Sequence, residues 1–319
     1  MGKKGKHGTG IEWTHGAGYK GETWNPLRGC SRISEGCRYC YAEIMAARFC
    51  GPGQPYEGVA HRVGGEARWT GEVRLIEDKL DQPLRWKKPR MVFVNSMSDL
   101  FHESLDNETI ARIFKVMACA PQHIFQTLTK RTSRMREWFE WAGPRAEQLV
   151  NVTVEGQKYG LDKWPLKNVW LGTSAEDQAT ADLRIPHLLQ CPAHIRWVSA
   201  EPLLGPIEWG LLGVVPKDWG IGYVPAHMLL HWIVVGGESG GVGARECRLE
   251  WIRAMIEECR EITPIFVKQL GSKPWHKPET WVVPLNLKHR KGGDQEEWPD
   301  DLRIRQYPRD FKEIEDVDS

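Results

Sequence analysis

Short apolar runs, separated by segments of helical periodicity, dominate the middle of the chain. The runs are rich in Val, Ile, Phe and Trp, and they fall at Met91–Asn95, Ile124–Leu128, Val169–Gly172, Ile195–Ser199, Trp232–Val235 and Pro264–Val267. Runs that are apolar on both faces suit the strands of a parallel sheet that is covered on both sides. Asn107–Ala120 and Leu249–Cys259 carry apolar residues at helical spacing, the first behind an Asn cap. With a further strand near Thr23–Leu27, the pattern predicts an α/β chain with about six to seven parallel strands in a partial (β/α) barrel.

Polar side chains follow nearly every one of these runs. In chain order they are Ser96, Ser98 and Asp99, then Thr129, Lys130 and Arg131, then Ser174, Glu176 and Asp177, then Glu201, Glu238, Ser239, Lys268 and Gln269. The carboxyl ends of parallel strands meet at one edge of the sheet, where loops converge and sites are built. We therefore expect a shared functional rim there, although ordinary loop polarity would explain any one residue taken alone.

The ends of the chain differ from its middle. Residues 1–20 are rich in Gly and carry Lys3, Lys4 and Lys6, which predicts a flexible basic arm. Residues 21–270 hold the predicted barrel, with Gly205–His231 as an insertion between strands. Residues 271–319 contain Pro and charge throughout, which predicts a C-terminal extension packed on the barrel.

Composition narrows the class of protein. The chain of 319 residues has 43 Lys and Arg against 42 Asp and Glu, a formal net charge of +1, and 41% hydrophobic residues. This is enough apolar surface for a core and excludes a disordered polymer, while the balanced charge argues against a wholesale nucleic-acid coat. No window approaches the roughly 20 apolar residues of a membrane helix, and the first residues lack the apolar stretch of a secretion signal. We therefore expect a soluble cytoplasmic protein with no membrane partner.

Three of the eight cysteines lie close together, in the segment Thr23–Glu43, TWNPLRGCSRISEGCRYCYAE. Cys30, Cys37 and Cys40 have the spacing C-x6-C-x2-C. Three thiolates on a loop between a strand and a helix can hold three irons of a [4Fe–4S] cluster and leave the fourth iron open to an exchangeable ligand. Two alternatives stay open: a zinc site, which needs a fourth protein ligand, and a disulfide with one free thiol, which an intracellular address disfavours.

The cysteine segment resembles the radical S-adenosylmethionine (SAM) superfamily. The likeness lies in two aromatic residues, Tyr39 inside the last cysteine pair and Tyr41 directly after it, and in the position of the segment after the first strand. The common spacing in that superfamily is C-x3-C-x2-C, so the first gap of this chain is three residues longer. Together with VFVNSMSDLFHE, FQTLTKR, VWLGTSAEDQ, SAEPLLGPI, IVVGGESG and FVKQLG, the segment is similar to a phage-associated three-cysteine family of unknown function, from about Trp13 to KGGDQEEWPDDLRIRQYP.

The resemblance implies a cofactor and its contacts. SAM would chelate the open iron, and one electron from a flavodoxin-like donor would cleave it to methionine and a 5′-deoxyadenosyl radical, which abstracts a substrate hydrogen. By strand position, the resemblance implies these cofactor-binding residues: Tyr39, Tyr41, Ser96, Ser98, Asp99, Ser174 and Glu176. The Gly236–Gly237 turn would allow close approach of backbone to adenine or substrate, although a tight strand-end turn explains the two glycines equally well.

Two further features bear on the substrate. Among sixteen Trp, those in polar or Gly/Pro surroundings are freest to stack on bases: Trp24, Trp69, Trp209, Trp219 and Trp275. Basic residues near the rim could meet phosphates or pair with rim carboxylates: Arg28, Arg32, Arg38, Lys130, Arg131, Arg134 and Lys268. These features permit a nucleic acid without proving one.

Relatives in the family that the chain resembles occur with phage genes for hypermodified thymine in DNA. The resemblance therefore implies a radical SAM isomerase that remodels an amino acid attached to thymine, acting on DNA in the host cytoplasm if the protein is phage-encoded. A base must leave the duplex stack to enter a barrel. Inside the barrel, we expect the catalytic residues Glu201, Glu238 and Lys268 to meet the charged groups of the amino acid.

Two other functions stay open. One is a radical SAM DNA repair enzyme that resembles spore photoproduct lyase, whose hydrogen-donating cysteine would be Cys119, Cys191 or Cys247. The other is a non-catalytic, metal-stabilised nucleic-acid-binding module.

Overall fold

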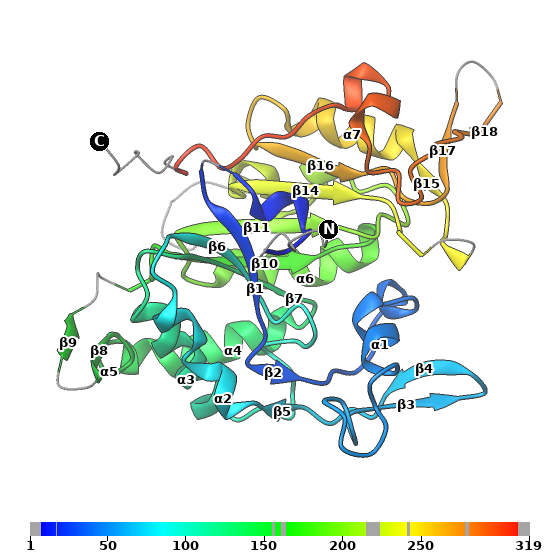
Figure 1. Cartoon of the computed structure of the whole chain (residues 1–319). Helices are drawn as coiled ribbons and strands as arrows, with labels where there is room; N and C mark the ends of the chain where they lie inside the picture. Colours follow the sequence, from blue (N-terminus) through cyan, green and yellow to red (C-terminus); the bar gives the residue numbers. More distant parts are fainter. Residues whose placement is uncertain are drawn as a thin grey trace, which may run out of the picture.

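A seven-stranded sheet forms the centre of the computed structural model, which describes residues 8–16, 18–154, 157–160, 164–214, 224–240, 243–277 and 281–311. The strands lie side by side in chain order: β1 (Lys20–Trp24), β6 (Arg90–Val94), β7 (Ile124–Thr129), β10 (Val169–Ser174), β11 (Ile195–Ala200), β14 (Trp232–Gly236) and β16 (Ile265–Gln269). All neighbouring pairs are parallel, and the sheet curls into an open half-barrel (Figure 1). The prediction of a partial (β/α) barrel is confirmed.

Four helices cover the convex face of the sheet (Figure 1): α3 (Asn107–Ala118), α4 (Thr132–Ala142), α6 (Gln178–Gln190) and α7 (Leu249–Cys259). Helix α7 has the bounds that its periodicity predicts. Helix α3 ends at Ala118, and its N-cap is Asp106 rather than the expected Asn107. The Asp106 carboxylate accepts a hydrogen bond from the backbone N–H of Thr109 at 2.6 Å, and a negative charge also suits the positive end of the helix.

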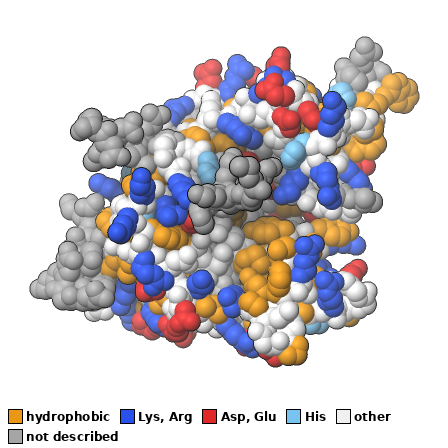
Figure 2. All heavy atoms as spheres, in the orientation of Figure 1, with side chains coloured by type: hydrophobic (Ala, Val, Ile, Leu, Met, Phe, Trp, Pro, Cys, Tyr) orange, Lys and Arg blue, Asp and Glu red, His pale blue; other side chains and the backbone are white. Residues whose placement is uncertain are grey.

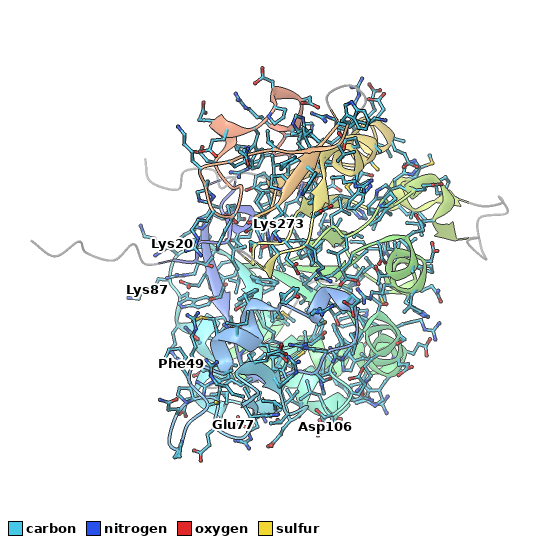
Figure 3. The ribbon with its side chains drawn as sticks, turned by 90° about the vertical axis from the view of Figure 1, so that its right-hand side faces the viewer. Lys20, Phe49, Glu77, Lys87, Asp106 and Lys273 are labelled. Atoms are coloured by element: carbon cyan, nitrogen blue, oxygen red, sulfur yellow. The ribbon has the colours of Figure 1, made fainter. Side chains whose placement is uncertain are left out.

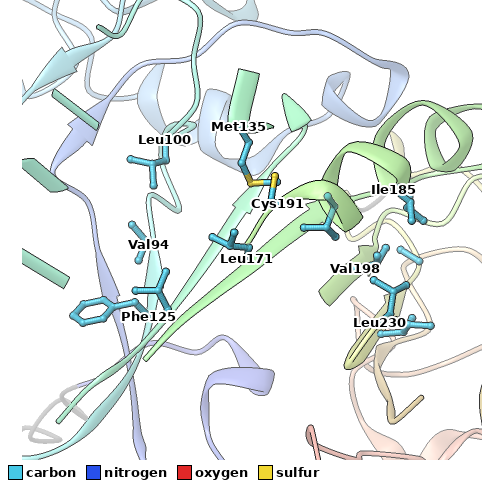
Figure 4. Close-up of a cluster of buried hydrophobic side chains, with 14 of the residues drawn as sticks. Val94, Leu100, Phe125, Met135, Leu171, Ile185, Cys191, Val198 and Leu230 are labelled. Carbon is cyan, nitrogen blue, oxygen red and sulfur yellow. The ribbon is translucent and has the colours of Figure 1, made fainter. Parts of the chain in front are cut away.

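The two faces of each strand bury different apolar clusters. On β6, Val92 and Val94 face the helices, whereas Met91 and Phe93 face the concave side of the half-barrel. Figure 4 shows part of the outer cluster, with Val94 among its residues. Burial on both faces explains why the strands appear in the sequence as continuous apolar runs.

Aromatic side chains pack together on the concave side of the half-barrel. Trp13, in a 3-10 turn over Glu12–Thr14, has its ring centroid 4.9 Å from Phe93 and 5.1 Å from Trp197. From the other end of the chain, Tyr307 stacks on Trp232 at 5.7 Å. Since Trp13 is only 3% exposed, this part of the expected N-terminal arm belongs to the packed body; Lys3, Lys4 and Lys6 lie outside the described residues.

The described part of the C-terminal segment packs on the edge of the sheet. Gln306 N donates to Ile265 O at 2.9 Å, and Val267 N donates to Ile304 O at 2.8 Å. Trp298 is buried between this segment and the barrel. The segment thereby covers the edge of β16, whose backbone groups would otherwise be unpaired.

The remaining elements are short. They are the helices α1 (Tyr41–Ala46), α2 (Glu77–Leu80) and α5 (Ala146–Val150), and the strands β2 (Leu27–Arg28), β3 (Ala60–Val63), β4 (Glu66–Trp69), β5 (Arg74–Leu75), β8 (Asn151–Val154), β9 (Gln157–Gly160), β12 (Gly213–Val214), β13 (Val224–Pro225), β15 (Cys247–Arg248), β17 (Pro274–His276) and β18 (Val283–Pro284). Single 3-10 turns lie at Glu35–Cys37, Gln82–Arg85, Gly143–Arg145, Trp209–Leu211, Ala226–Met228, Gln295–Glu297 and Asp300–Leu302. In the described part of the chain, no helix has the length and apolarity that crossing a membrane requires.

Candidate active site

The cysteine segment, residues 30–40, lies at the carboxyl ends of the strands, between β2 and α1. Gly29, just before it, forms a bridge to Ser98, which follows β6. Cys30, Cys37 and Cys40 are free and partly exposed. Burial, and then the charge of Asp99, raise the pKa of the Cys30 thiol to about 12, and the charges of the other two thiolates add to this rise. The three thiols therefore lie close enough for their charges to interact.

The thiols have the donor chemistry of an iron–sulfur cluster. Among the described residues, no three His, Cys, Asp or Glu side chains meet as the shell of one metal ion. Ligands of one tetrahedral ion, with bonds of about 2.3 Å, lie about 3.8 Å apart, whereas thiolates that bind different irons are held apart by the cluster itself. Burial raises the pKa of the Cys40 thiol as it does that of Cys30, and the charges of Lys130 and Arg131 act against this rise at Cys40 and Cys30 respectively.

Arg131, which follows β7, fixes the start of the cysteine segment. Its side chain is 4% exposed and donates to Ser31 O at 2.9 Å, to Cys30 Sγ at 3.8 Å and to Asp99 Oδ2 at 3.0 Å. Asp99 also accepts a hydrogen bond from Thr129 Oγ1 at 2.7 Å. The Asp99 carboxylate therefore orients the arginine that holds the cysteine segment.

Glu176, which follows β10, fixes the middle of the segment. Its carboxylate is paired with Lys130 at 2.5 Å and with Arg184 at 2.9 Å, and it accepts a hydrogen bond from Ser34 Oγ at 3.2 Å. A side chain at Gly36 would collide with this carboxylate, so glycine is required there. Burial acts to raise the pKa of Glu176, but the charges of Lys130 and Arg184 outweigh it and hold the pKa below its ordinary value.

Arg245, on the chain after β14, makes a third attachment. It donates to both carboxylate oxygens of Glu238, at 2.6 and 3.0 Å, and to the backbone oxygen of Glu35 at 2.9 Å. Its guanidinium also lies 5.5 Å from the centre of the Tyr39 ring. In this structure Arg131 and Arg245, which bind the cysteine segment, engage the carboxylates of Asp99 and Glu238. Lys130 and Arg184 engage that of Glu176, which itself binds Ser34 of the segment. The expected contacts of these three carboxylates with SAM or substrate stay predictions.

Glu201 and Lys268 form an ion pair across the mouth of the half-barrel, which is its open end at the carboxyl ends of the strands. The Lys268 ammonium lies 2.8 and 2.9 Å from the two Glu201 oxygens, and each side chain is 18% exposed. Gln269 Nε2 donates to Glu201 Oε1 at 2.9 Å and to Gly237 O at 3.1 Å. Two of the three residues expected to be catalytic therefore form one partly exposed ion pair, while Glu238 lies after the neighbouring strand.

The serines and glycines expected to contact SAM have structural partners. Ser96 Oγ donates to Asn25 at 3.1 Å, and Ser98 Oγ donates to Leu27 O at 3.2 Å. A Cβ on Gly237 would collide with the backbone oxygen of Leu270, so this glycine permits close packing of two chain segments. A Cβ on Gly236 would lie 3.2 Å from Gln269 O, which is tight but needs only a small shift. The carbonyl of Ser174 accepts a hydrogen bond from Arg184 at 2.8 Å.

The two tyrosines lie at the rim of the site. Tyr41 donates its hydroxyl hydrogen to Ser96 O at 2.7 Å, although much of its ring is exposed. The exposed apolar residues on and around α1 are Tyr39, Tyr41, Ile44, Met45 and Phe49. Figure 2 shows an orange patch on the right-hand half of its face, over α1, with Lys and Arg side chains around it. The mouth is therefore bordered by an apolar surface.

Asn95 is a candidate that the sequence analysis did not single out. It directly follows β6, has a φ of 59° and is the single non-glycine residue with positive φ in the described ranges. It is 3% exposed, yet neither atom of its side-chain amide has a hydrogen-bond partner in the structure. Asn tolerates the left-handed region better than most residues, but an unpaired buried amide is costly. In the sequence, Asn95 is simply the last residue of an apolar run.

The cysteines outside the segment differ in where they lie. Cys119 and Cys191 are the C-caps of α3 and α6, which places both at the end of the sheet opposite to the mouth. Cys247 is 1% exposed and packs against the backbone of Gly237 at the mouth. Burial raises the pKa of its thiol to about 12.

Most of the residues expected to contact a nucleic acid are buried or have partners within the protein. Trp24 and Trp209 are fully buried, and Trp219 lies outside the described residues. Five of the rim cations pair with carboxylates: Arg32 with Glu43, Arg38 with Glu35, Lys130 with Glu176, Arg131 with Asp99, and Lys268 with Glu201. Arg28 and Arg134 donate to backbone oxygens. These seven cations therefore have partners within the described protein.

Comparison with known proteins gives a family. Neither the curated proteins nor the solved structures contain a significant match to this chain. One family model matches residues 8–301, a range that includes the cysteine segment and every strand of the seven-stranded sheet. The chain therefore belongs to the family described as protein of unknown function (DUF5131).

Proposed function

We propose that the protein is a radical SAM enzyme that remodels an amino acid attached to thymine in DNA. The observation that carries the proposal is the position of three free, mutually interacting cysteines at the mouth of a parallel half-barrel. Cys30, Cys37 and Cys40 would hold a [4Fe–4S] cluster, which when bound supplies the electron that cleaves SAM to a 5′-deoxyadenosyl radical.

A primary carbon radical attacks whatever is nearest, so its site has to exclude water. The aromatic residues on the concave side of the half-barrel, which we call the barrel floor, suit this need. Trp13, Phe93 and Trp197 pack edge to face or tilted against one another beneath the mouth. Trp13 and Trp197 are at most 3% exposed and Phe93 is 8% exposed, so these rings form a closely packed layer. The residues of the floor therefore exclude water from below and leave the mouth as the route of entry.

Asn95 is the residue we assign to the amino acid portion of SAM. Its amide offers one acceptor and two donor hydrogens, and none of them is used within the described protein. The α-ammonium and α-carboxylate of SAM need an acceptor and a donor respectively, so one amide can meet both. Asn95 also precedes Ser98, which bridges to Gly29 beside Cys30.

Lys268 and Glu201 suit the amino acid of the substrate. An amino acid carries one positive and one negative group, and this ion pair can exchange its internal partner for those two groups. After the exchange each charge again has an opposite charge beside it. A buried charge that lost its partner would cost several kcal/mol. In this role Lys268 binds the α-carboxylate and Glu201 binds the α-ammonium.

The test is anaerobic reconstitution followed by assay on modified DNA. Protein with iron, sulfide, SAM and a flavodoxin or dithionite as reductant is incubated with phage DNA that carries thymine adducts, and the nucleosides are analysed by mass spectrometry. We expect a rearranged adduct, and we expect deuterium from the α-carbon of the adduct to appear in 5′-deoxyadenosine. Unmodified DNA is the control. Cleavage of SAM without any change in an adduct or transfer of deuterium would refute the substrate.

One observation favours a second candidate, repair of a thymine lesion with a cysteine as hydrogen donor. Cys247 lies at the mouth, and its raised pKa keeps the S–H bond intact at neutral pH. Replacing Cys247 by Ala should then abolish repair of a spore-type photoproduct, whereas Cys191→Ala, at the far end of the sheet, should not. Equal repair activity in both variants, or none in the wild type, would eliminate this candidate.

A further inference from the structure

An open cleft of about 560 Å³ lies beside the mouth. The residues that give it its chemistry are Leu204, Arg245, Glu246, Arg248, Trp251 and Lys273. They come from the chain after β11, the chain after β14, the strand β15, the start of α7 and the residue just before β17. A volume of this size lies within the range of roughly 300 to 1,000 Å³ that is typical of ligand sites.

The cleft is directly connected to the candidate active site. Leu204 N donates to the backbone oxygen of Glu176 at 2.7 Å. Arg245, on the other wall, bonds to Glu238 and to the backbone of Glu35 in the cysteine segment. A ligand in the cleft would therefore contact residues that bind directly to the rim of the mouth.

Two cations of the cleft have no carboxylate partner among the described residues. Arg248 and Lys273 are exposed, and no carboxylate of the described residues lies within ion-pair distance of either, in contrast to the paired cations of the rim. Ser272 Oγ donates to Arg290 O at 2.7 Å, which brings the exposed run Lys288–Lys291 alongside. Figure 3, which faces the right-hand side of Figure 1, labels Lys273 near the middle of this face.

An aromatic ring accompanies these charges. The guanidinium of Arg248 lies 5.7 Å from the centre of the Trp251 ring, and Trp251 is half-buried in the wall of the cleft. Cations beside an exposed aromatic face are the combination with which proteins bind the backbone and bases of nucleic acids. The acid Glu246 also lines the cleft and offsets part of the positive charge.

We propose that this cleft binds the phosphodiester backbone of a polynucleotide, next to the nucleotide whose base enters the barrel. The proposal rests on the proposed function, which makes the polymer DNA. Arg248 and Lys273 neutralise two phosphates, and Trp251 supports an adjacent sugar or base. Binding there holds the strand beside the mouth while the barrel receives one base.

The test is the salt dependence of DNA binding, measured by fluorescence anisotropy with labelled single-stranded and duplex oligonucleotides. Each phosphate contact contributes about 0.7 to 0.9 to the slope of log K against log salt. The double variant Arg248→Gln, Lys273→Gln should flatten the slope by about 1.4 to 1.8 and weaken binding about tenfold or more at 0.1 M salt. Arg248→Lys with Lys273→Arg should retain the slope, and Glu246→Gln should tighten binding.

The matched control is Lys87→Gln with Lys88→Gln, which removes two exposed cations before β6, at the opposite end of the sheet. Figure 3 labels Lys87 away from the middle of the face. This control should leave both slope and affinity unchanged. Equal weakening by the two double variants, no weakening by either, or displacement of the probe by thymidine monophosphate as readily as by an oligonucleotide would overturn the proposal.

These outcomes are separable from failure of the proposed function, because binding is measured without SAM or reductant. Binding that depends on Arg248 and Lys273 in a protein that never cleaves SAM would support the cleft and refute the radical chemistry. Cleavage of SAM, together with DNA binding that ignores both residues, would refute the cleft alone.

Discussion

Glu176 accepts a hydrogen bond from Ser34 at 3.2 Å and so ties the end of β10 to the middle of the cysteine segment. Ser34 lies in the gap between Cys30 and Cys37, which is longer than the common spacing of the superfamily that the chain resembles. Arg131 and Arg245 bind the same gap at Ser31 and Glu35. The longer gap is therefore a tethered segment, held by residues that follow three different strands.

Replacing Glu176 by Gln should destabilise the fold strongly. The carboxylate is 1% exposed and compensates the buried side chain of Arg184 as well as Lys130, so its loss leaves buried positive charge unpaired, at a cost of about 3–5 kcal/mol. The measurement is the free energy of unfolding in urea. Glu103→Gln is the control, since Glu103 is 60% exposed in its pair with Arg131 and should cost less than about 1 kcal/mol. Equal costs would show that the Glu176 contacts add no stability of their own.

The same carboxylate should make the protein sensitive to acid. Its pKa in the folded protein lies below the ordinary value of 4.5, so its stabilising contribution is complete above pH 4.5 and is lost as the pH falls through the folded pKa. Unfolding free energies measured from about pH 6 to pH 3 should fall more steeply for the wild type than for Glu176→Gln. Parallel curves for the two proteins would contradict this assignment.

Asn95→Gly should separate cofactor binding from stability. Glycine adopts a φ of 59° without strain, and the substitution removes an amide that has no partner in the fold. The free energy of unfolding should stay unchanged or rise by up to about 1 kcal/mol, while the Kd for SAM, measured by equilibrium dialysis of the reconstituted protein, should rise about tenfold, the loss of roughly 1.4 kcal/mol. A marked loss of stability with normal SAM binding would make Asn95 a structural residue.

Six of the strands could be predicted because each is buried on two faces and therefore carries a continuous apolar run. The exception is β1, whose sequence KGETW mixes exposed, partly exposed and buried residues; a strand was expected near Thr23–Leu27, but β1 spans Lys20–Trp24. The edge of the sheet that gathers polar residues follows from the same rule, since parallel strands end together. Helix α7 was found with its bounds because its apolar residues repeat every turn. Trp13 was not recognised as part of the core, because a single Trp in a Gly-rich segment shows no period and only its contact with Phe93 reveals it.

The partners within the site could not be predicted, because they come from long-range pairing. Asp99, Glu176 and Glu238 stand at the expected edge, but nothing near them in sequence indicates that Arg131, Arg184 and Arg245 engage them. Asn95 was missed for the reverse reason. Its importance lies in a backbone angle and in missing hydrogen bonds, neither of which has a sequence pattern.

Lys268→Met should uncouple cleavage of SAM from turnover of the substrate. Methionine retains much of the length of the side chain but cannot bind a carboxylate or pair with Glu201. Reductive formation of 5′-deoxyadenosine should continue, whereas the yield of rearranged nucleoside per 5′-deoxyadenosine should fall by about two orders of magnitude, as expected when an interaction with a charged substrate group is lost. Lys273→Met is a control for loss of charge outside the barrel in assays on the free modified nucleoside. An unchanged yield in Lys268→Met would remove this residue from substrate binding.

The most direct test of the central claim is iron content and 5′-deoxyadenosine release after anaerobic reconstitution with SAM and a reductant. The wild type and Cys50→Ser, a control that removes a partly exposed thiol outside the segment, should each bind about four irons per chain and release 5′-deoxyadenosine. Cys30→Ser, Cys37→Ser and Cys40→Ser should each lose the intact cluster and release none. A wild-type protein that binds a single zinc ion and leaves SAM intact would contradict the claim.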